Sequence, residues 1–257
     1  MHFLAVWDLM AVLFLGAALG FFGGLFGIGG GIIAIPLLAL AFGMDQALAQ
    51  GTSLAMMVPI LAVGLWRYSR NRPIPWVSAL WIGLLASITT WIVAHFATQL
   101  QPDILRGVFG LFLLFLAFQM LIAKQRHESD SGRSHLNPRL MPMVGVAAGT
   151  SMGLLGVGGG LVATPLLTGL FGQRQALAQS LSMALVTPCA VVALATYSVA
   201  DCVDWSMGLP LAFGGLLTVS AGVAVAHQLP ERKMRLLFAV MLMATALWLL
   251  IKPYVVG

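Results

Sequence analysis

Two glycine clusters, each followed by a helix rich in neutral hydrogen-bond donors, are the residues of this chain best suited to hold a ligand. The clusters are Gly27–Gly31 and Gly156–Gly160, and each has four glycines in five positions. A glycine inside a helix costs about 1 kcal/mol relative to alanine, so each cluster should end one helix and let another begin. The N–H groups and the dipole at the start of the new helix favour an anion. Close helix packing, which small residues also permit, is the alternative.

The polar residues after each cluster recur at helical spacing, at i, i+4 and i+7. They are Gln46, Gln50 and Ser53, and in the second half Gln175, Gln179 and Ser182. Uncharged amides and hydroxyls on one helix face can hold an oxyanion. Interhelical hydrogen bonding, worth about 0.6 kcal/mol per bond, is the alternative, and for Gln46 and Gln175 the two interpretations weigh equally. The predicted substrate-binding residues are Gly27, Gly29, Gly30, Gly31, Gln50, Thr52, Ser53, Gly156, Gly158, Gly159, Gly160, Gln179, Ser180 and Ser182.

These motifs lie in a duplicated sequence. Gly24–Pro59 and Gly153–Pro188 align without a gap at an offset of 129 residues. The same offset pairs glycines at four-residue spacing, which we interpret as helix packing: Gly16, Gly20 and Gly24 with Gly145, Gly149 and Gly153. We divide the chain into a first repeat (1–123), a linker (124–139) and a second repeat (140–257). Glycine-broken hydrophobic segments in corresponding halves of a membrane chain point to a transporter's substrate site.

The composition is that of an integral membrane protein. Of the 257 residues 60% are hydrophobic and 8% are charged, against about 25% charged in soluble domains. The predicted segments are 6–26, 31–43, 47–66, 76–98, 103–123, 140–155, 160–172, 176–199, 205–228 and 234–251. The first is expected to be a retained helix, because no basic leader or small-residue cleavage site precedes it. The net charge of +5 is ordinary for basic cytoplasmic loops and gives no argument for nucleic acid.

Loop charges predict that the two repeats have opposite orientations. The loop after the third segment is basic in the first half, with Arg67, Arg70 and Arg72, and acidic in the second, with Asp201 and Asp204. Basic loops face the cytoplasm, so equivalent loops should lie on opposite sides of the membrane. The linker is then cytoplasmic and both termini lie outside. The two glycine breaks would approach the membrane from opposite sides.

The second segment of each repeat is short for a membrane span. The apolar stretches 31–42 and 160–171 have about a dozen residues, which at about 1.5 Å per residue covers little more than half of a hydrocarbon core of roughly 30 Å. Inversion requires the first two segments together to cross an even number of times. Either both cross, or they form a broken or re-entrant hairpin, and we favour the hairpin. The expected fold is therefore an all-α polytopic membrane protein with two inverted-topology repeats, each with such a hairpin followed by three transmembrane helices.

The remaining motifs have structural interpretations. Aromatic residues flanking loops are typical of the membrane–water boundary, namely Tyr68, Trp76, Tyr197 and Trp205. His95 and His227 lie near segment ends, where a histidine at the membrane surface is expected. The stretch Gly149–Gly153 matches the GxSxG pattern of hydrolases but lacks the strand-turn-helix context and a base partner. Without a nucleophile–base set or a metal cluster, an enzyme is disfavoured and no cofactor is expected.

The absence of a carboxylate at membrane depth limits the ligand. Proton-relay pumps and many cation-coupled carriers place Asp or Glu there. A neutral pocket built from helix N-termini, amides and hydroxyls instead suits a small anion. No ATP-binding loop is present.

The paired motifs resemble the TauE/SafE family of sulfite exporter-like permeases over essentially the whole chain. The residues that carry the resemblance are Gly27–Gly31, Pro36, Leu37, Gln50–Leu54, Trp76, Gly156–Gly160, Pro165, Leu166, Gln179–Met183, Asp204 and Trp205. The resemblance implies an inner-membrane transporter for sulfite, organosulfonates or related small anions. Pro75 stands where Asp204 stands in the second half, so this loop is not expected to act symmetrically.

The leading hypothesis is a secondary transporter of small anions that works by alternating access, with one site at the repeat interface. A passive anion channel and a permease for another small organic anion remain open, and a non-transporting membrane partner is disfavoured by the inverted duplication. The expected partners are the small anionic substrate and the lipid bilayer. A homodimer is compatible with the sequence. The expected location is a bacterial-type inner membrane.

Overall fold

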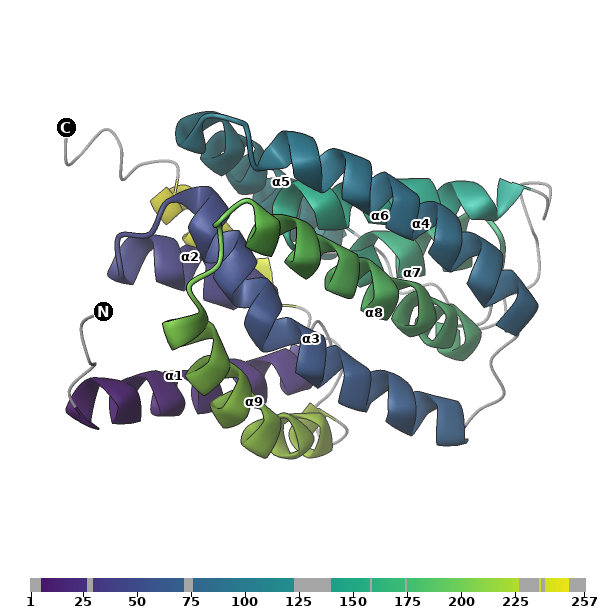
Figure 1. The fold of residues 1–257 in the computed structure, drawn as a ribbon. Helices are drawn as coiled ribbons and strands as arrows, with labels where there is room; N and C mark the ends of the chain where they lie inside the picture. The colour runs from purple at the N-terminus through teal and green to yellow at the C-terminus, as the bar shows by residue number, and fades with distance from the viewer. Residues whose placement is uncertain are drawn as a thin grey trace. The chain divides into compact units, whose positions relative to one another are not determined.

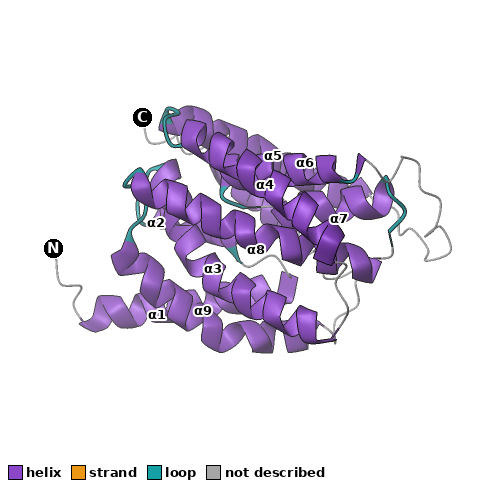
Figure 2. Ribbon diagram, turned by 45° about the vertical axis from the view of Figure 1, so that its right-hand side comes forward, coloured by secondary structure: helices purple, strands orange, loops and turns teal. Residues whose placement is uncertain are grey.

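The computed structural model describes residues 6–26, 30–71, 76–122, 140–157, 159–173, 175–226, 236 and 239–249. Every regular element in these residues is helical (Figure 2), which confirms the all-α prediction. The helices are α1 (Val6–Phe26), α2 (Gly31–Ala41), α3 (Gln46–Asn71), α4 (Trp76–Ala97), α5 (Pro102–Ile122), α6 (Pro142–Leu155), α7 (Gly159–Gly169), α8 (Gln175–Val199) and α9 (Trp205–Ala226) (Figure 1). A further apolar helix spans Ala239–Leu249.

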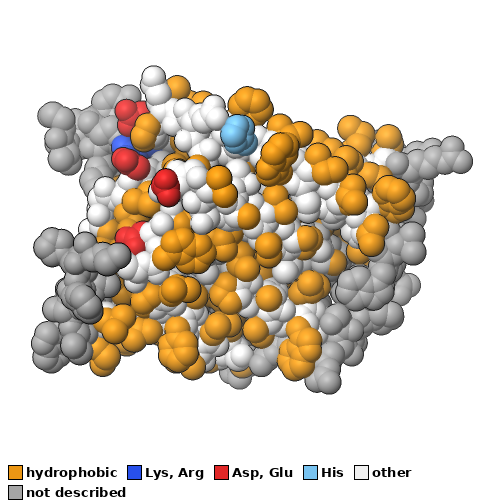
Figure 3. Space-filling model, in the orientation of Figure 1, with side chains coloured by type: hydrophobic (Ala, Val, Ile, Leu, Met, Phe, Trp, Pro, Cys, Tyr) orange, Lys and Arg blue, Asp and Glu red, His pale blue; other side chains and the backbone are white. Residues whose placement is uncertain are grey.

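Several helices are suited to cross a bilayer. Four in the described residues are long and apolar enough, within α3, α4, α5 and α8. On α4 one face is apolar and exposed, with Trp81, Leu84, Ile88 and Trp91 between 48% and 62% accessible. Hydrophobic side chains are spread over the face drawn in Figure 3. In water such a surface would promote aggregation, whereas in a bilayer it contacts lipid. The chain is a multi-pass membrane protein.

The helices break at the glycine clusters, as predicted. α1 ends at Phe26 and α2 begins at Gly31, while α6 ends at Leu155 and α7 begins at Gly159. Both α2 and α7 have 11 residues, or roughly 16 Å of helix, about half of a hydrocarbon core. Neither helix is long enough to span a membrane alone.

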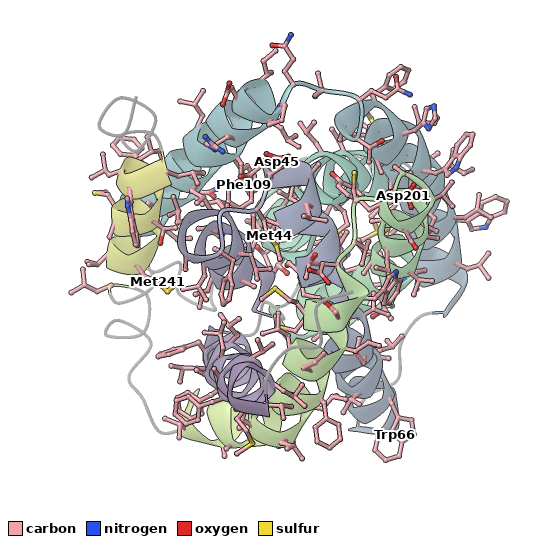
Figure 4. All side chains as sticks on the ribbon, turned by 60° about the vertical axis from the view of Figure 1, so that its left-hand side comes forward. Met44, Asp45, Trp66, Phe109, Asp201 and Met241 are labelled. Atoms are coloured by element: carbon pink, nitrogen blue, oxygen red, sulfur yellow. The ribbon has the colours of Figure 1, made fainter. Side chains whose placement is uncertain are left out.

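The end of α3 differs from the sequence prediction. A segment ending at residue 66 was expected, but α3 continues to Asn71. Hydropathy marks where a chain leaves lipid, whereas a helix ends only where its backbone hydrogen bonds stop, so a helix can extend past the apolar boundary. Trp66 is 56% accessible at this boundary and lies at the outer surface of α3 (Figure 4), a position typical of membrane-surface aromatic residues.

The chain forms two compact units, and each combines helices from both halves of the sequence. Unit 1 comprises residues 1–60, 100–123 and 202–257, and unit 2 comprises residues 61–99 and 124–201. Thus α1, α2, the first part of α3, α5 and α9 belong to unit 1, and the rest of α3, α4, α6, α7 and α8 to unit 2. These units describe packing, whereas the repeat boundaries describe the duplication and stay a prediction.

In unit 1, α1 packs along α9 through glycines. A Cβ atom placed on Gly16 or Gly20 would lie less than 3.0 Å from the backbone of Leu211 or Gly215. The Thr218 hydroxyl donates to the carbonyl oxygen of Ala17 at 2.5 Å, which ties the two helices together. Only glycine permits backbones to approach this closely.

In unit 2, α6 packs along α4 in the same way. A Cβ on Gly145 or Gly149 would lie less than 3.0 Å from the backbone of Ile82 or Ala86. These contacts join the same pairs of repeat positions as the contacts in unit 1. At the offset of 129 residues, Gly145 corresponds to Gly16 and Leu211 corresponds to Ile82. The prediction that these glycines serve helix packing is confirmed.

The short helices also end alike. Gly43 follows α2 with φ of 66°, and Gly172 follows α7 with φ of 62°. The next N–H in each case donates back to the last turn: Met44 to the Leu38 oxygen at 3.3 Å and Gln173 to the Leu167 oxygen at 3.0 Å. Each of these bonds reaches back six residues across a glycine, which takes the left-handed conformation without strain. Met44 is buried and the next residue, Asp45, is exposed where α3 begins (Figure 4).

Candidate functional site

The break in unit 1 is built around Gly30. Its φ of 81° lies in the left-handed region, and a Cβ there would lie 2.9 Å from the Leu19 oxygen and 3.2 Å from Cε of Met56. Its carbonyl oxygen accepts from the N–H groups of Ile33 and Ala34 at 3.1 and 3.0 Å. No side chain caps the start of α2. Both Gly30 and Gly31 are buried, so an uncapped helix start lies inside the protein against α3.

The break in unit 2 has its left-handed glycine at the end of α6. Gly156 takes the left-handed conformation, with φ of 65°, and its N–H donates to the Met152 oxygen at 3.0 Å. Gly159 already belongs to α7 and is buried, and a Cβ on it would lie 3.0 Å from Cγ2 of Val186. Gly160 is half-buried. The remaining cluster members, Gly27, Gly29 and Gly158, lie outside the described residues.

The first part of α3 carries the polar residues of unit 1, and all are enclosed by protein. Gln50, Thr52 and Ser53 are each 0% accessible. Ser53 donates to the sulfur of Met57, one turn further on, at 3.8 Å. Met56, which follows these polar residues in α3, has its Cε 3.2 Å from a Cβ placed on Gly30, so α3 packs against the glycine break. The sequence prediction of Gln50 and Ser53 on an inward face is consistent with this burial.

Thr52 has a defined structural partner. Its Oγ1 accepts a hydrogen bond from the backbone N–H of Asp204 at 3.0 Å, which ties α3 to the loop before α9. The Asp204 carboxylate in turn accepts from the N–H groups of Ser206 and Met207 at 2.9 and 3.2 Å, and so caps α9. A Cβ on the adjacent Gly51 would overlap the carbonyl group of Cys202. Thr52 therefore holds the α8–α9 loop in place, a role that the sequence did not indicate.

In unit 2 the corresponding polar contact joins two helices. The hydroxyls of Thr164 on α7 and Ser182 on α8 lie 2.9 Å apart, and Ser182 is 4% accessible. The repeat counterpart of Thr164 is Ile35, which is fully buried. That difference explains why Ser53, the counterpart of Ser182, bonds within its own helix instead. The side chains of Gln179 and Ser180 lie outside the described residues.

Three buried or half-buried polar residues of unit 2 were missed by the sequence prediction. Thr90 donates to the Gly149 oxygen at 3.2 Å, and Ser151 donates to the Val157 oxygen at 3.3 Å, beside the glycine break. Thr164 is the third. None of them has a polar residue of the same kind at the matching repeat position, so a search for duplicated residues passes over them. Helical periodicity would have found Thr90, which shares the inward face of α4 with Ala86 and Ala94.

Tyr197 corrects the prediction of a membrane-surface aromatic residue. It is 0% accessible, and its hydroxyl donates to the Gly153 oxygen at 3.2 Å. Gly153 has no side chain to cover its carbonyl group, so the ring can reach it. Trp205, at 43% accessible, and the exposed His95, which contacts Gln99 at 3.2 Å, agree with positions near a membrane surface. The side chains of Tyr68 and Trp76, and His227, lie outside the described residues.

Within the described residues each unit offers neutral donors and acceptors. The buried polar side chains there are amides and hydroxyls: Gln46, Gln50, Thr52, Ser53, Thr90, Ser151 and Ser182. The same residues contain no group of three or more His, Cys, Asp or Glu side chains placed to hold a metal ion.

The fold and the site together define a polytopic helical membrane protein in which glycine clusters separate α1 from α2 and α6 from α7, and in which α3 and α8 carry buried neutral polar residues. The family model for the sulfite exporter TauE/SafE matches residues 12–249. The chain belongs to this family and is a membrane transporter.

Relatives support the same class. A probable membrane transporter protein of Methanocaldococcus jannaschii, MJ0441, is 30% identical over 61% of this chain and 60% of its own length. A probable membrane transporter protein of Xylella fastidiosa strain 9a5c is 25% identical over 91% of this chain and 92% of its own length. YunE of Bacillus subtilis, also named a probable membrane transporter protein, is 24% identical over 92% of this chain. No solved structure matches the chain.

Proposed function

We propose that this protein is a secondary transporter of small anions that works by alternating access, and that its substrate is sulfite, an organosulfonate or a related sulfur-containing oxyanion. The observation that carries the proposal is the neutrality of the buried polar residues of unit 1, in the same unit as an uncapped helix start at Gly30–Gly31. Helix N-termini and amide or hydroxyl donors stabilise an anion. A cation site built from charged side chains would instead use buried carboxylates.

The family name supports the substrate class, because it describes sulfite exporters. The names of the relatives describe membrane transport without a substrate. Sulfur oxyanions also fit the chemistry, because they are compact and present several acceptor oxygens to N–H and O–H donors.

The orientation of the chain is part of the proposal. We place it in a bacterial-type inner membrane, with the linker 124–139 in the cytoplasm, both termini outside and the two repeats inverted. Support comes from the basic loop at Arg67–Arg72 and its acidic counterpart at Asp201–Asp204. In a Cys202→Ser background, an impermeant thiol reagent should label Asp201→Cys in intact cells and Asn71→Cys only after permeabilisation. Equal labelling of both would contradict the inversion.

The decisive experiment measures sulfite and sulfoacetate flux in proteoliposomes containing the full chain. Gln50→Ala and Gln179→Ala should each lower the flux at low substrate concentration about tenfold, the value of a single neutral hydrogen bond. Gln119→Ala is the matched control, because Gln119 is exposed on α5. Flux unchanged in both test variants would remove these residues from the site.

The alternative function is a passive anion channel, which a neutral pathway also suits. Preloaded substrate distinguishes the two. A carrier shows faster uptake when substrate is present on the opposite side, whereas a channel does not. A permease for another small organic anion would show such counterflow with carboxylates but not with sulfite or sulfonates.

A further inference from the structure

Gln46, the first residue of α3, is the described residue whose burial is hardest to explain. Its side chain is 0% accessible, and neither the amide oxygen nor the amide nitrogen has a hydrogen-bond partner within the described chain. Buried polar groups in proteins are almost always paired, because an unpaired group loses its bonds to water and gains nothing in return. A fold keeps such a residue only if something compensates for that loss.

The surroundings of Gln46 place it on the polar face of α3. Gln50 and Ser53 follow at i+4 and i+7, so the three side chains share one side of the helix, and all three are 0% accessible. Asp45 directly before it is exposed. The polar face therefore begins at Gln46, beside an exposed residue, and continues into the protein toward Ser53.

We propose that Gln46 binds the transported anion directly, and that this anion carries a hydrogen-bond donor of its own. The inference rests on the proposed function and narrows its substrate class. An amide presents two different unpaired groups: Oε1 only accepts, and Nε2 only donates. A fully deprotonated oxyanion has acceptors alone, so it pairs with Nε2 and leaves Oε1 unsatisfied. A hydroxyl-bearing sulfonate or a protonated oxyanion such as hydrogen sulfite satisfies both.

The experiment compares two sulfonates of equal charge, isethionate and ethanesulfonate, which differ by one hydroxyl group. Uptake is measured in proteoliposomes with the full chain. The wild-type protein should show a KM about tenfold lower for isethionate, as expected for one additional hydrogen bond. Gln46→Met should bring the two KM values together. Its thermal midpoint in detergent should stay equal or rise, because the substitution removes two unpaired buried groups and keeps the volume.

Gln119→Met is the control for the substitution itself, because Gln119 is exposed on α5 and should leave the isethionate preference unchanged. A preference for isethionate that survives in Gln46→Met, or a wild type without any preference, overturns the inference while sulfonate transport still supports the proposed function. A buried water on Gln46 in place of the anion would give this result. A wild type that transports neither sulfonate nor sulfite overturns the proposed function and the inference with it.

Discussion

The two units share one type of helix contact and differ in their polar contacts. In unit 1 the α1 glycines pack against the backbone of α9, and in unit 2 the α6 glycines pack against α4 at the repeat-equivalent positions. The polar contacts do not follow the repeat in this way. Thr52 accepts from the N–H of Asp204 in unit 1, whereas their sequence counterparts are Leu181 and Pro75.

That second difference has a simple physical reason. Proline has no backbone N–H to donate and leucine has no oxygen to accept, so both members of the hydrogen bond are missing together. Thr164 and Ser182 show the opposite case, because their bond exists in unit 2 and is lost in unit 1, where Ile35 replaces Thr164. The backbone framework is thus shared by both copies, while each copy has polar contacts of its own.

The largest effect is expected from the glycines that both units share. Gly20→Ala and Gly149→Ala each place a methyl group against backbone atoms that cannot move independently, of Gly215 and of Ala86. Each variant should lose about 1–3 kcal/mol of stability, as overpacked cores do. The measurement is the thermal unfolding midpoint in detergent, with the yield of monodisperse protein.

Gly107→Ala is the control for these variants. No atom lies within 4 Å of a Cβ at Gly107 in α5, so alanine there should stabilise the helix by up to about 1 kcal/mol. A wild-type midpoint for either Gly20→Ala or Gly149→Ala would show that its helix contact is not as close as described. The two variants should lose similar amounts of stability. A much larger loss in one of them would show that the two glycine contacts are not equivalent.

A smaller effect is expected from the contact that only unit 1 has. Thr52→Val keeps the shape of the side chain and removes the acceptor for the Asp204 N–H, which should cost about 1 kcal/mol. Thr52→Ser should retain most of this stability. The thermal midpoint again provides the measurement.

Thr187→Val is the matched control for Thr52→Val. Within the described part of the chain the Thr187 hydroxyl donates only to the Met183 oxygen of its own helix, at 2.9 Å, so its removal leaves no donor there unpaired. If Thr52→Val and Thr187→Val lower the thermal midpoint equally, the hydrogen bond from Asp204 to Thr52 contributes no more stability than a hydroxyl bonded within its own helix.

The smallest effect is expected from the hydroxyl pair of unit 2. A double-mutant cycle of Thr164→Val and Ser182→Ala should give a coupling of about 0.6 kcal/mol, the average for interhelical hydrogen bonds in membranes. The equivalent cycle in unit 1, Ile35→Val with Ser53→Ala, should give a coupling near zero, because Ser53 bonds Met57. Coupling energies of equal size in the two cycles would show that the polar contacts of the two units do not differ.

Much of the fold could be predicted because it is encoded locally. Glycine disfavours the helix because its backbone loses more entropy on ordering. The positions of the glycine clusters in the sequence therefore locate the breaks before α2 and α7. The Gly16–Gly20 and Gly145–Gly149 spacing identifies helix faces for close packing, although not the helices they face. For the candidate site, helical spacing predicted the polar face of Gln50 and Ser53, and both are buried.

The tertiary structure decided which segments meet. Apolar membrane helices present similar surfaces, so no local pattern shows that α1 packs against α9 and α6 against α4, or that α3 is divided between two units. Hydropathy also could not distinguish a tyrosine at a membrane surface from Tyr197, whose hydroxyl bonds Gly153. The sequence by itself determined where helices begin, break and pack closely, because those properties depend on neighbouring residues. Only the tertiary structure decided which distant helices and side chains meet, because a hydrogen bond or a backbone contact depends on both of the residues that form it.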